Sequence, residues 1–168
     1  MILDKINVIG EGIYRALSGD AVYIDIQKLN DCKIIQDCKA DNVESALRYA
    51  YSNPPHINDT EISAMETKRN DIYMKTKKVY LENVLMSGCA FCRERSIFLH
   101  ILLAQLGVNS TIYTGTDPDL GRHTFVTYKQ DGILKVLDPM NSTNTENMDD
   151  YIRFNEDFRK QNLVASKI

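Results

Sequence analysis

A long apolar helix is the feature that most constrains this fold. Residues 92–106 read CRERSIFLHILLAQL, and apolar side chains surround most of the helix that they predict, at Ile97, Phe98, Ile101, Leu102 and Leu103. Gly107 follows, where glycine commonly ends a helix because positive φ costs it nothing. A helix that is apolar on most of its surface has to be covered by other elements. We therefore expect this segment to be the buried centre of the fold.

Three β-rich runs follow this helix and supply a surface that can cover it. They extend over 108–114, 122–128 and 133–137. Gln130-Asp131-Gly132 lies between the last two runs and is typical of a hairpin turn. Because strands joined by short turns pair antiparallel, we expect an α+β fold in which a mainly antiparallel sheet packs on the buried helix.

The part of the chain before this core is predicted to be mainly helical. Apolar residues at positions 2, 6, 9, 13 and 17 have helical spacing, and a helix over 42–50 is stopped by Asn53-Pro54-Pro55. A second helix is predicted from Thr60, as its N-cap, to about Met86, and Ser87-Gly88 ends it. Beyond the core, 141–150 is predicted to be a polar loop and 149–163 a short helix.

Length and composition fit one domain, 1–168. A chain of 168 residues buries roughly 70% of the surface that it exposes when unfolded, which is enough for one core. We divide it into a mainly helical N-terminal portion (1–87), a core (88–141), and a polar loop with a C-terminal helix (142–168). Hydrophobic residues at 43% and charged residues at 26% argue against a disordered or membrane-spanning chain.

Net charge and cysteine content restrict which partners and which cellular compartment we expect. The formal net charge is −3, so nucleic acid is not an expected partner, because proteins that bind it carry a basic surplus. No apolar run approaches the roughly 20 residues that cross a bilayer, and the N-terminus lacks the apolar stretch of a secretory signal. Four cysteines are too few for a disulfide scaffold. We expect a cytoplasmic protein, or one delivered to a target-cell cytosol by a specialised secretion route.

The hairpin brings His123 and Asp138 together. A two-residue turn at Gln130-Asp131 places them directly opposite each other, with Cβ atoms about 5 Å apart. A turn at Asp131-Gly132 instead makes them a diagonal pair. A carboxylate that holds one imidazole nitrogen leaves the other free to act as a base.

Cys92 is the expected nucleophile for this base. It opens the most buried helix, where the helix dipole and the first backbone N–H groups favour a thiolate and can also hold an oxyanion. Each residue alone has a structural explanation: an inert buried thiol, a structural histidine, and a strand-ending Asp138-Pro139 turn. Their combination predicts a triad in which Cys92 is the nucleophile, His123 the base and Asp138 the residue that orients it.

The segment from Gly88 to Asn141 resembles the transglutaminase-like branch of the papain-like cysteine enzymes. That branch has a cysteine with an acidic residue two positions on and a small residue four positions on, then a leucine-rich helix, Leu-Gly, a strand and glycine. The matching positions are Cys92, Glu94, Ser96, Leu106-Gly107 and Gly115. The next two family blocks match His123 in HTFVTY and Asp138-Pro139 in LDPMN.

The resemblance implies a papain-like core and Cys-His-Asp chemistry through a thioester intermediate, with no cofactor or metal. It assigns the nucleophile to Cys92 rather than Cys89.

Phe125 replaces a tryptophan that the family often carries two residues after the histidine, and the chain holds no tryptophan. The chain is shorter than full arylamine acetyltransferases. The 15-residue step from His123 to Asp138 is similar to that of bacterial effector deamidases and related proteases, and the Cys92 helix is similar to that of lasso-peptide leader peptidases.

We therefore expect an enzyme that acts on a protein or peptide substrate, by deamidation or transamidation of a glutamine side chain. A cysteine protease of the same clan, including the leader-peptidase type, is the first alternative. Nothing in the sequence fixes the oligomeric state.

Three other interpretations stay open at this stage. Cys89-Ala90-Phe91-Cys92 has the spacing of a thioredoxin-like dithiol, although the chain has no proline directly before the strand of His123. Cys32, Cys38, Cys89 and Cys92 together are enough thiolates for a structural zinc site. The chain can also be a non-catalytic interaction module with a papain-like core. Cys89 is either a core residue or the partner of Cys92 in a regulatory disulfide, and His56 and His100 are expected to be structural.

Overall fold

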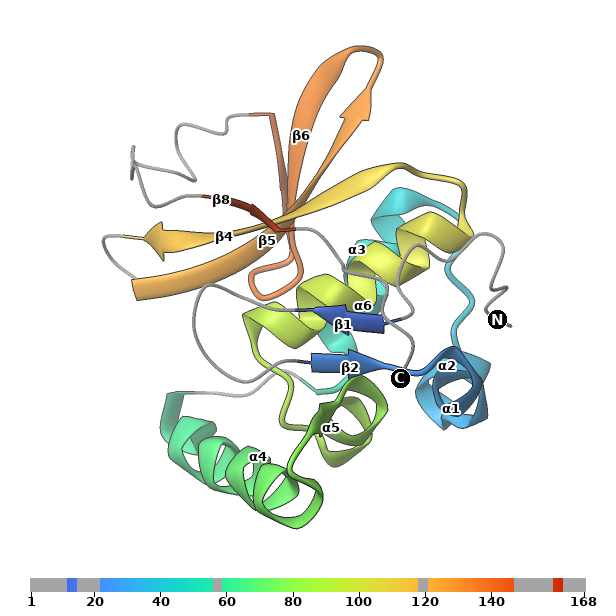
Figure 1. Cartoon of the computed structure of the whole chain (residues 1–168). Coiled ribbons are helices and arrows are strands. Elements are labelled where there is room, and N and C mark those ends of the chain that lie inside the picture. Colours follow the sequence, from blue (N-terminus) through green and yellow to red (C-terminus); the bar gives the residue numbers. More distant parts are fainter. Residues whose placement is uncertain (1–11, 15–21, 56–58, 118–120, 147–158, 162–168) are drawn as a thin grey trace.

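The computed structural model describes residues 12–14, 22–55, 59–117, 121–146 and 159–161. Within these ranges the chain is a mixed α+β fold in which a twisted sheet stands over a group of helices (Figure 1). The helices are α1 (Ile26–Asp31), α2 (Lys33–Gln36), α3 (Val43–Ser52), the 3-10 turn η1 (Asp59–Glu61), α4 (Ile62–Thr76), α5 (Leu81–Ser87) and α6 (Cys92–Gln105). The strands are β1 (Gly12–Tyr14), β2 (Val22–Ile24), β3 (Val79–Tyr80), β4 (Ser110–Asp117), β5 (Gly121–Gln130), β6 (Ile133–Asp138), β7 (Thr143–Thr145) and β8 (Arg159–Gln161).

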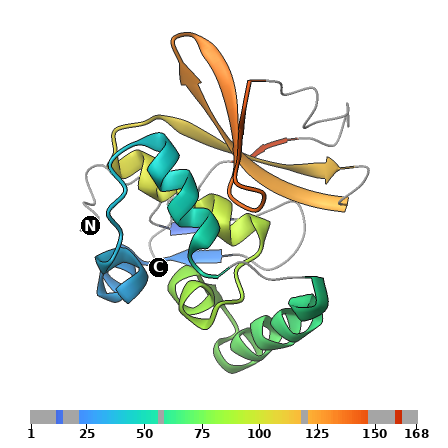
Figure 2. The ribbon, with the colours of Figure 1, turned by 180° about the vertical axis from the view of Figure 1, so that it is seen from behind.

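Helix α6 is the centre of the fold, as its sequence predicts. Every residue from 93 to 104 is buried. Helix α3 packs along one side of α6, and strands β4 and β5 cover another (Figure 2). Gly107 follows the helix with a φ of +74°, the left-handed conformation that lets a chain leave a helix at low cost.

The larger sheet is antiparallel throughout, with the strand order β7-β6-β5-β4-β8. The β5–β6 turn is Asp131-Gly132, whose φ values are +53° and +80°. Positive φ at both turn residues is typical of the two-residue hairpin turn whose twist matches that of the flanking strands. Thr127 therefore pairs with Val136, so the predicted register that places His123 opposite Asp138 is wrong, and the diagonal alternative is the one found.

The N-terminal portion is less helical than predicted. Strand β2 pairs antiparallel with β1 and parallel with β3, which gives a three-stranded sheet that the sequence patterns did not indicate. The single helix predicted from Thr60 to Met86 is two helices, because Lys77 adopts a φ of +55° after α4 and β3 then pairs with β2. Helix α5 ends at Gly88 (φ +70°), where an end was predicted.

The chain ends also differ from prediction where they are described. Residues 12–14 form a strand within the segment of predicted helical spacing, and 159–161 form β8 within the predicted C-terminal helix. The rest of both predicted segments lies outside the described residues. Strand β7 (Thr143–Thr145) forms within the predicted polar loop over 141–150. In the described part of the chain, no helix combines the length and the apolar character needed to cross a membrane.

Arg95 ties the first turn of α6 to the end of α3. Its side chain is fully buried, and its guanidinium donates to the backbone carbonyls of Ala90 (3.1 Å), Ala50 (3.0 Å), Tyr51 (2.6 Å) and Pro55 (2.9 Å). Burial lowers the pKa of Arg95 to about 10, so it stays charged at neutral pH. The carbonyls satisfy a buried cation and fix the direction in which α6 begins.

Replacing Arg95 is expected to destabilise the fold more than any exposed arginine does. Arg95→Met leaves several buried carbonyls without a donor and should lower the free energy of unfolding by about 3 kcal/mol or more. Urea denaturation measures this loss. Arg48→Met, an exposed change on α3, is the matched control and should stay within about 0.5 kcal/mol of the parent; equal losses in the two variants would contradict the role of Arg95.

Candidate active site

Cys92 is the first residue of α6 and is half-buried. The chain reaches it from Gly88 through buried Cys89 and Ala90. The N–H of Phe91, the residue before Cys92, donates to Oε2 of Glu94 at 3.1 Å, so the helix start is held by one of its own side chains. The Cys92 N–H belongs to the first turn, where no intrahelical carbonyl accepts it. It is therefore placed to bind an oxyanion next to the sulfur.

His123 and Asp138 are joined although their register is diagonal. Nε2 of His123 lies 2.7 Å from Oδ2 of Asp138, and both side chains are buried. The described β5–β6 pairing stops at Val126 and Leu137. Beyond that point β5 and β6 are not paired with each other, whereas His123 pairs with Gly115 of β4 and Asp138 pairs with Thr143 of β7.

Two further donors hold the Asp138 carboxylate. The N–H of Met140 donates to Oδ1 at 2.8 Å, and Nδ2 of Asn141 donates to Oδ2 at 2.7 Å. A buried carboxylate with three donors has both oxygens fixed in direction. Asn141 is a member of this group that the sequence patterns did not single out; an aspartate followed by proline, with asparagine three positions after the aspartate, is a turn pattern that can signal it.

The Cys92 side chain completes the group by its interaction with His123. Burial acts to lower the pKa of His123, but hydrogen bonds to Asp138 and Cys92, with the charges of both groups, raise it to about 10. Because Nε2 is bonded to Asp138, the nitrogen that remains for the thiol is Nδ1. The three residues predicted as a triad therefore lie together, in the order sulfur, imidazole, carboxylate, and the environment favours an imidazolium.

A second cluster of charges surrounds the start of α6. Glu94 is buried, and its Oε1 accepts from Arg69 of α4 at 3.0 Å and from Arg93 at 2.7 Å. Burial raises the pKa of the Glu94 carboxyl, and the charge of Arg69 acts against this rise. Glu94 thus connects α4 to the backbone that precedes Cys92.

Ser96 connects α6 to the strand that carries His123. Its Oγ donates to the carbonyl oxygen of Thr124 at 3.0 Å. Ser96 lies one turn after Cys92, and Thr124 directly follows His123. This bond sets the distance between the segments that carry the sulfur and the imidazole, which accounts for the small polar residue at this position.

Phe125, the position at which the resemblance predicts tryptophan, plays a packing role. Its side chain is fully buried, and its ring stacks on Tyr113 with centroids 5.9 Å apart and planes at 13°. A phenyl ring has no hydrogen-bond donor, so Phe125 cannot supply a second oxyanion donor.

Cys89 and His100 have structural surroundings. Cys89 is fully buried, and its Sγ lies 3.7 Å from the carbonyl oxygen of Val84. Burial raises the pKa of the Cys89 thiol. His100 is buried, with Nδ1 2.7 Å from Oγ of Ser110, and His56 lies outside the described residues.

All four cysteines are free thiols. Among the described residues, no three of the histidine, cysteine and acidic side chains are grouped so that they can hold a metal ion. The predicted alternative of a four-cysteine zinc site therefore has no counterpart in the described part of the chain.

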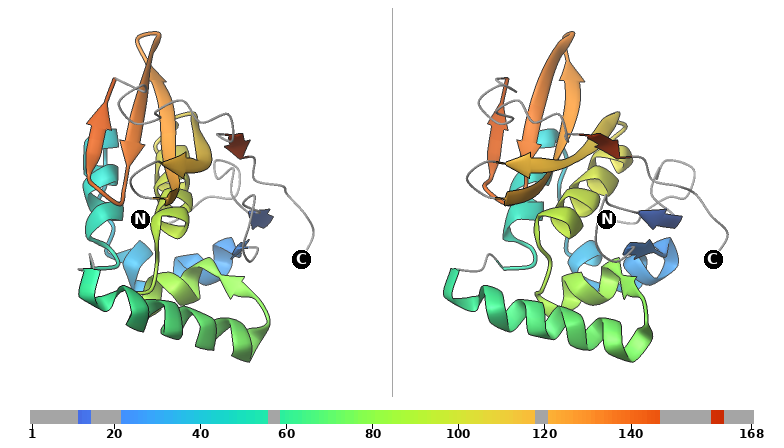
Figure 3. Two further views of the ribbon diagram at one scale, coloured as in Figure 1. Left: turned by 90° about the vertical axis from the view of Figure 1, so that its left-hand side faces the viewer. Right: turned by 60° about the vertical axis from the view of Figure 1, so that its left-hand side comes forward.

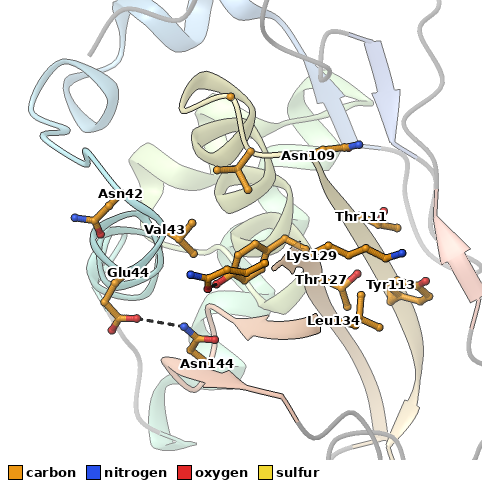
Figure 4. Close-up of a pocket in the computed structure, with 14 residues that line it drawn as sticks. Asn42, Val43, Glu44, Asn109, Thr111, Tyr113, Thr127, Lys129, Leu134 and Asn144 are labelled. Carbon is orange, nitrogen blue, oxygen red and sulfur yellow. Dashed lines mark hydrogen bonds between the residues drawn. The ribbon is translucent and has the colours of Figure 1, made fainter. Parts of the chain in front are cut away.

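A broad hollow of the surface lies away from Cys92, His123 and Asp138. It has a volume of about 930 Å³ and is bordered by α3, the connection from α6 to β4 and the β5–β6 hairpin (Figure 4). Glu44 and Asn144 approach each other across one side of it, at 3.5 Å. No member of the predicted triad lines this hollow, so we place the reactive site by the chemistry of Cys92, His123 and Asp138 and not by cavity size.

A scan against protein-family models found no match, and searches of curated proteins and of solved structures found none either. The functional interpretation therefore depends on the arrangement of the residues described above.

The raised pKa of His123 predicts how this residue titrates. The imidazolium should persist through neutral pH and lose its proton near pH 10, and Asp138→Asn should move this titration down toward the ordinary value near 6.5. Two-dimensional NMR of the histidine ring nitrogens as a function of pH measures both proteins, with His100 as the reference that the substitution leaves unchanged.

The raised pKa of His123 also predicts how the stability of the fold changes with pH. A folded-state pKa above the unfolded value stabilises the fold fully below pH 6.5, and this contribution disappears as pH rises toward 10. Titration of His123 near 6.5 in the parent protein would contradict the described geometry.

Proposed function

We propose that this protein is a transglutaminase-like cysteine enzyme with a papain-like core, and that it deamidates or transamidates a glutamine side chain of a protein or peptide. The observation that carries the proposal is the 2.7 Å contact between His123 and Asp138, with Cys92 interacting with the same imidazole. Cysteine acyl-transfer enzymes have the same spatial order of groups: a nucleophile, then a residue that carries the proton, then a carboxylate that orients this residue.

The first half of the proposed reaction forms a thioester. The sulfur of Cys92 attacks the carboxamide carbon, and the backbone N–H of Cys92 stabilises the oxyanion that develops. His123, as the imidazolium, gives its proton to the leaving nitrogen, which departs as ammonia. Asp138 keeps the ring oriented and stabilises its charged form.

The second half of the reaction releases the product. His123 accepts a proton from a water molecule, which attacks the thioester and leaves glutamate, or from a primary amine, which leaves a substituted amide. The sulfur of Cys92 is released in either case. Deamidation and transamidation therefore share the same three residues and differ in the molecule that reaches the thioester.

The surroundings of the two neighbouring cysteines favour this chemistry over a thioredoxin-like dithiol. Cys89 is fully buried, whereas Cys92 is half-buried and interacts with His123. A dithiol enzyme uses both sulfurs in turn, but a triad enzyme needs only Cys92.

Substitution of each cysteine tests the proposal. Cys92→Ala should reduce the release of ammonia from glutamine peptides by about a thousandfold or more, because it removes the nucleophile. Cys89→Ala, the matched control three residues away, should keep most of the activity. Ammonia release and amine incorporation are measured on both variants, and circular dichroism checks their folding. Loss of activity in Cys89→Ala but not in Cys92→Ala would contradict the proposal.

A further inference from the structure

Helix α4 lies beside the start of α6 and is loosely packed. Met65 is its buried residue, and Arg69, Ile72 and Tyr73 are half-buried. Figures 1 and 3 place α4 along the base of the molecule, below the N-terminal end of α6. Arg69 reaches the first turn of α6 through its bond to Glu94. Helix α4 thus forms a polar wall next to the candidate active site.

A hollow lies between this wall and the residue that precedes Cys92. It has a volume of about 420 Å³ and is lined by Glu66, Arg69, Asn70 and Phe91. The first three residues are spaced three and four positions apart on α4, so they share one face of that helix. Phe91 directly precedes Cys92. Cys92 does not itself line the hollow, but its neighbour Phe91 does.

The wall is fixed relative to the nucleophile. Arg69 Nη2 donates to Oε1 of Glu94 at 3.0 Å, and Oε2 of the same carboxylate accepts from the Phe91 N–H at 3.1 Å. One side of the hollow is thereby tied to the backbone that carries Cys92. A group held against this side has a defined position relative to the sulfur.

Two of the lining side chains are available to a ligand. Glu66 and Asn70 are exposed, and neither side chain has a hydrogen bond or ion pair with the rest of the described chain. The guanidinium of the half-buried Arg69 is directed at the buried Glu94, which also accepts from Arg93. The exposed charge that lines the hollow is the Glu66 carboxylate, and the Asn70 side-chain oxygen adds a second acceptor.

We propose that this hollow, here named the α4 subsite (Glu66, Arg69, Asn70 and Phe91), receives a lysine or arginine side chain of the acyl-donor substrate, close to the residue that Cys92 attacks. This inference rests on the proposed function, since it names the substrate feature read beside the same nucleophile. The Glu66 carboxylate pairs with the cationic head, and the ring of Phe91 contacts the aliphatic stem. An exposed ion pair of this kind corresponds to a preference of up to about fivefold.

Alkylation of Cys92 with charged reagents tests the α4 subsite without a known substrate. Iodoacetyl-lysine amide and iodoacetyl-glutamate amide carry the same reactive group beside opposite charges. Each labelling rate is divided by the rate with plain iodoacetamide, which removes differences in thiol reactivity, and peptide mass spectrometry confirms that Cys92 is the labelled residue. The parent protein should react about two- to fivefold faster with the lysine reagent than with the glutamate reagent.

Two charge-reversal variants separate the subsite from the general field of the protein. Glu66→Lys should invert the preference. Asp71→Lys changes the net charge equally on an exposed position of α4 outside the hollow, and should keep the parent preference. Equal rates in the parent, a preference for the glutamate reagent, or the same change in both variants would overturn the α4 subsite.

The same proteins distinguish this inference from the proposed function. Glutamine peptides with a neighbouring lysine are supplied to the parent, and ammonia release is measured. Turnover without any charge preference in alkylation contradicts the α4 subsite and leaves the proposed reaction standing. A preference for the lysine reagent in alkylation, without turnover of any glutamine peptide, supports a subsite that binds cations and contradicts the proposed reaction.

Discussion

The burial of α6 on all sides is the constraint from which the rest of the structure follows. Because residues 93–104 are all buried, α3, α5 and the strands β4 and β5 have to enclose the helix, and its first residue remains at the edge of that enclosure. Cys92 is that residue. The sheet that covers α6 also delivers His123 and Asp138 to the same edge, so one packing requirement brings the three side chains together.

Burial also demands that the charges in the first turn of α6 be satisfied. Arg95 donates to four backbone carbonyls, and Glu94 accepts from two guanidiniums and a backbone N–H. These groups lie within three residues of Cys92. The hydrogen bonds and ion pairs that compensate these charged side chains for the loss of water therefore also fix the backbone that carries Cys92. They connect this backbone to α3 and α4.

Sequence patterns predicted those parts of the fold whose signals are local. The apolar run before Gly107 indicated α6, and Gln130-Asp131-Gly132 indicated the β5–β6 hairpin. The diagonal register that the structure has was the alternative to the predicted one. The break at Lys77 gave no such signal, because a lysine with positive φ looks like any residue of a polar helix. The partners of Arg95 lie 40 to 45 residues away, except Ala90, and Arg69 is 25 residues from Glu94. Contacts over such distances depend on the folded chain and have no pattern in the sequence.

The account's central claim is that the imidazole of His123 activates Cys92. Its most direct test is the mass of the intact protein after brief treatment with iodoacetamide at pH 6, in the parent, in Cys92→Ser and in His123→Ala. The account predicts one rapidly labelled site in the parent and its loss in both variants, because an ordinary thiol is almost entirely protonated at that pH. Slow and equal labelling of the three proteins would contradict an activated Cys92.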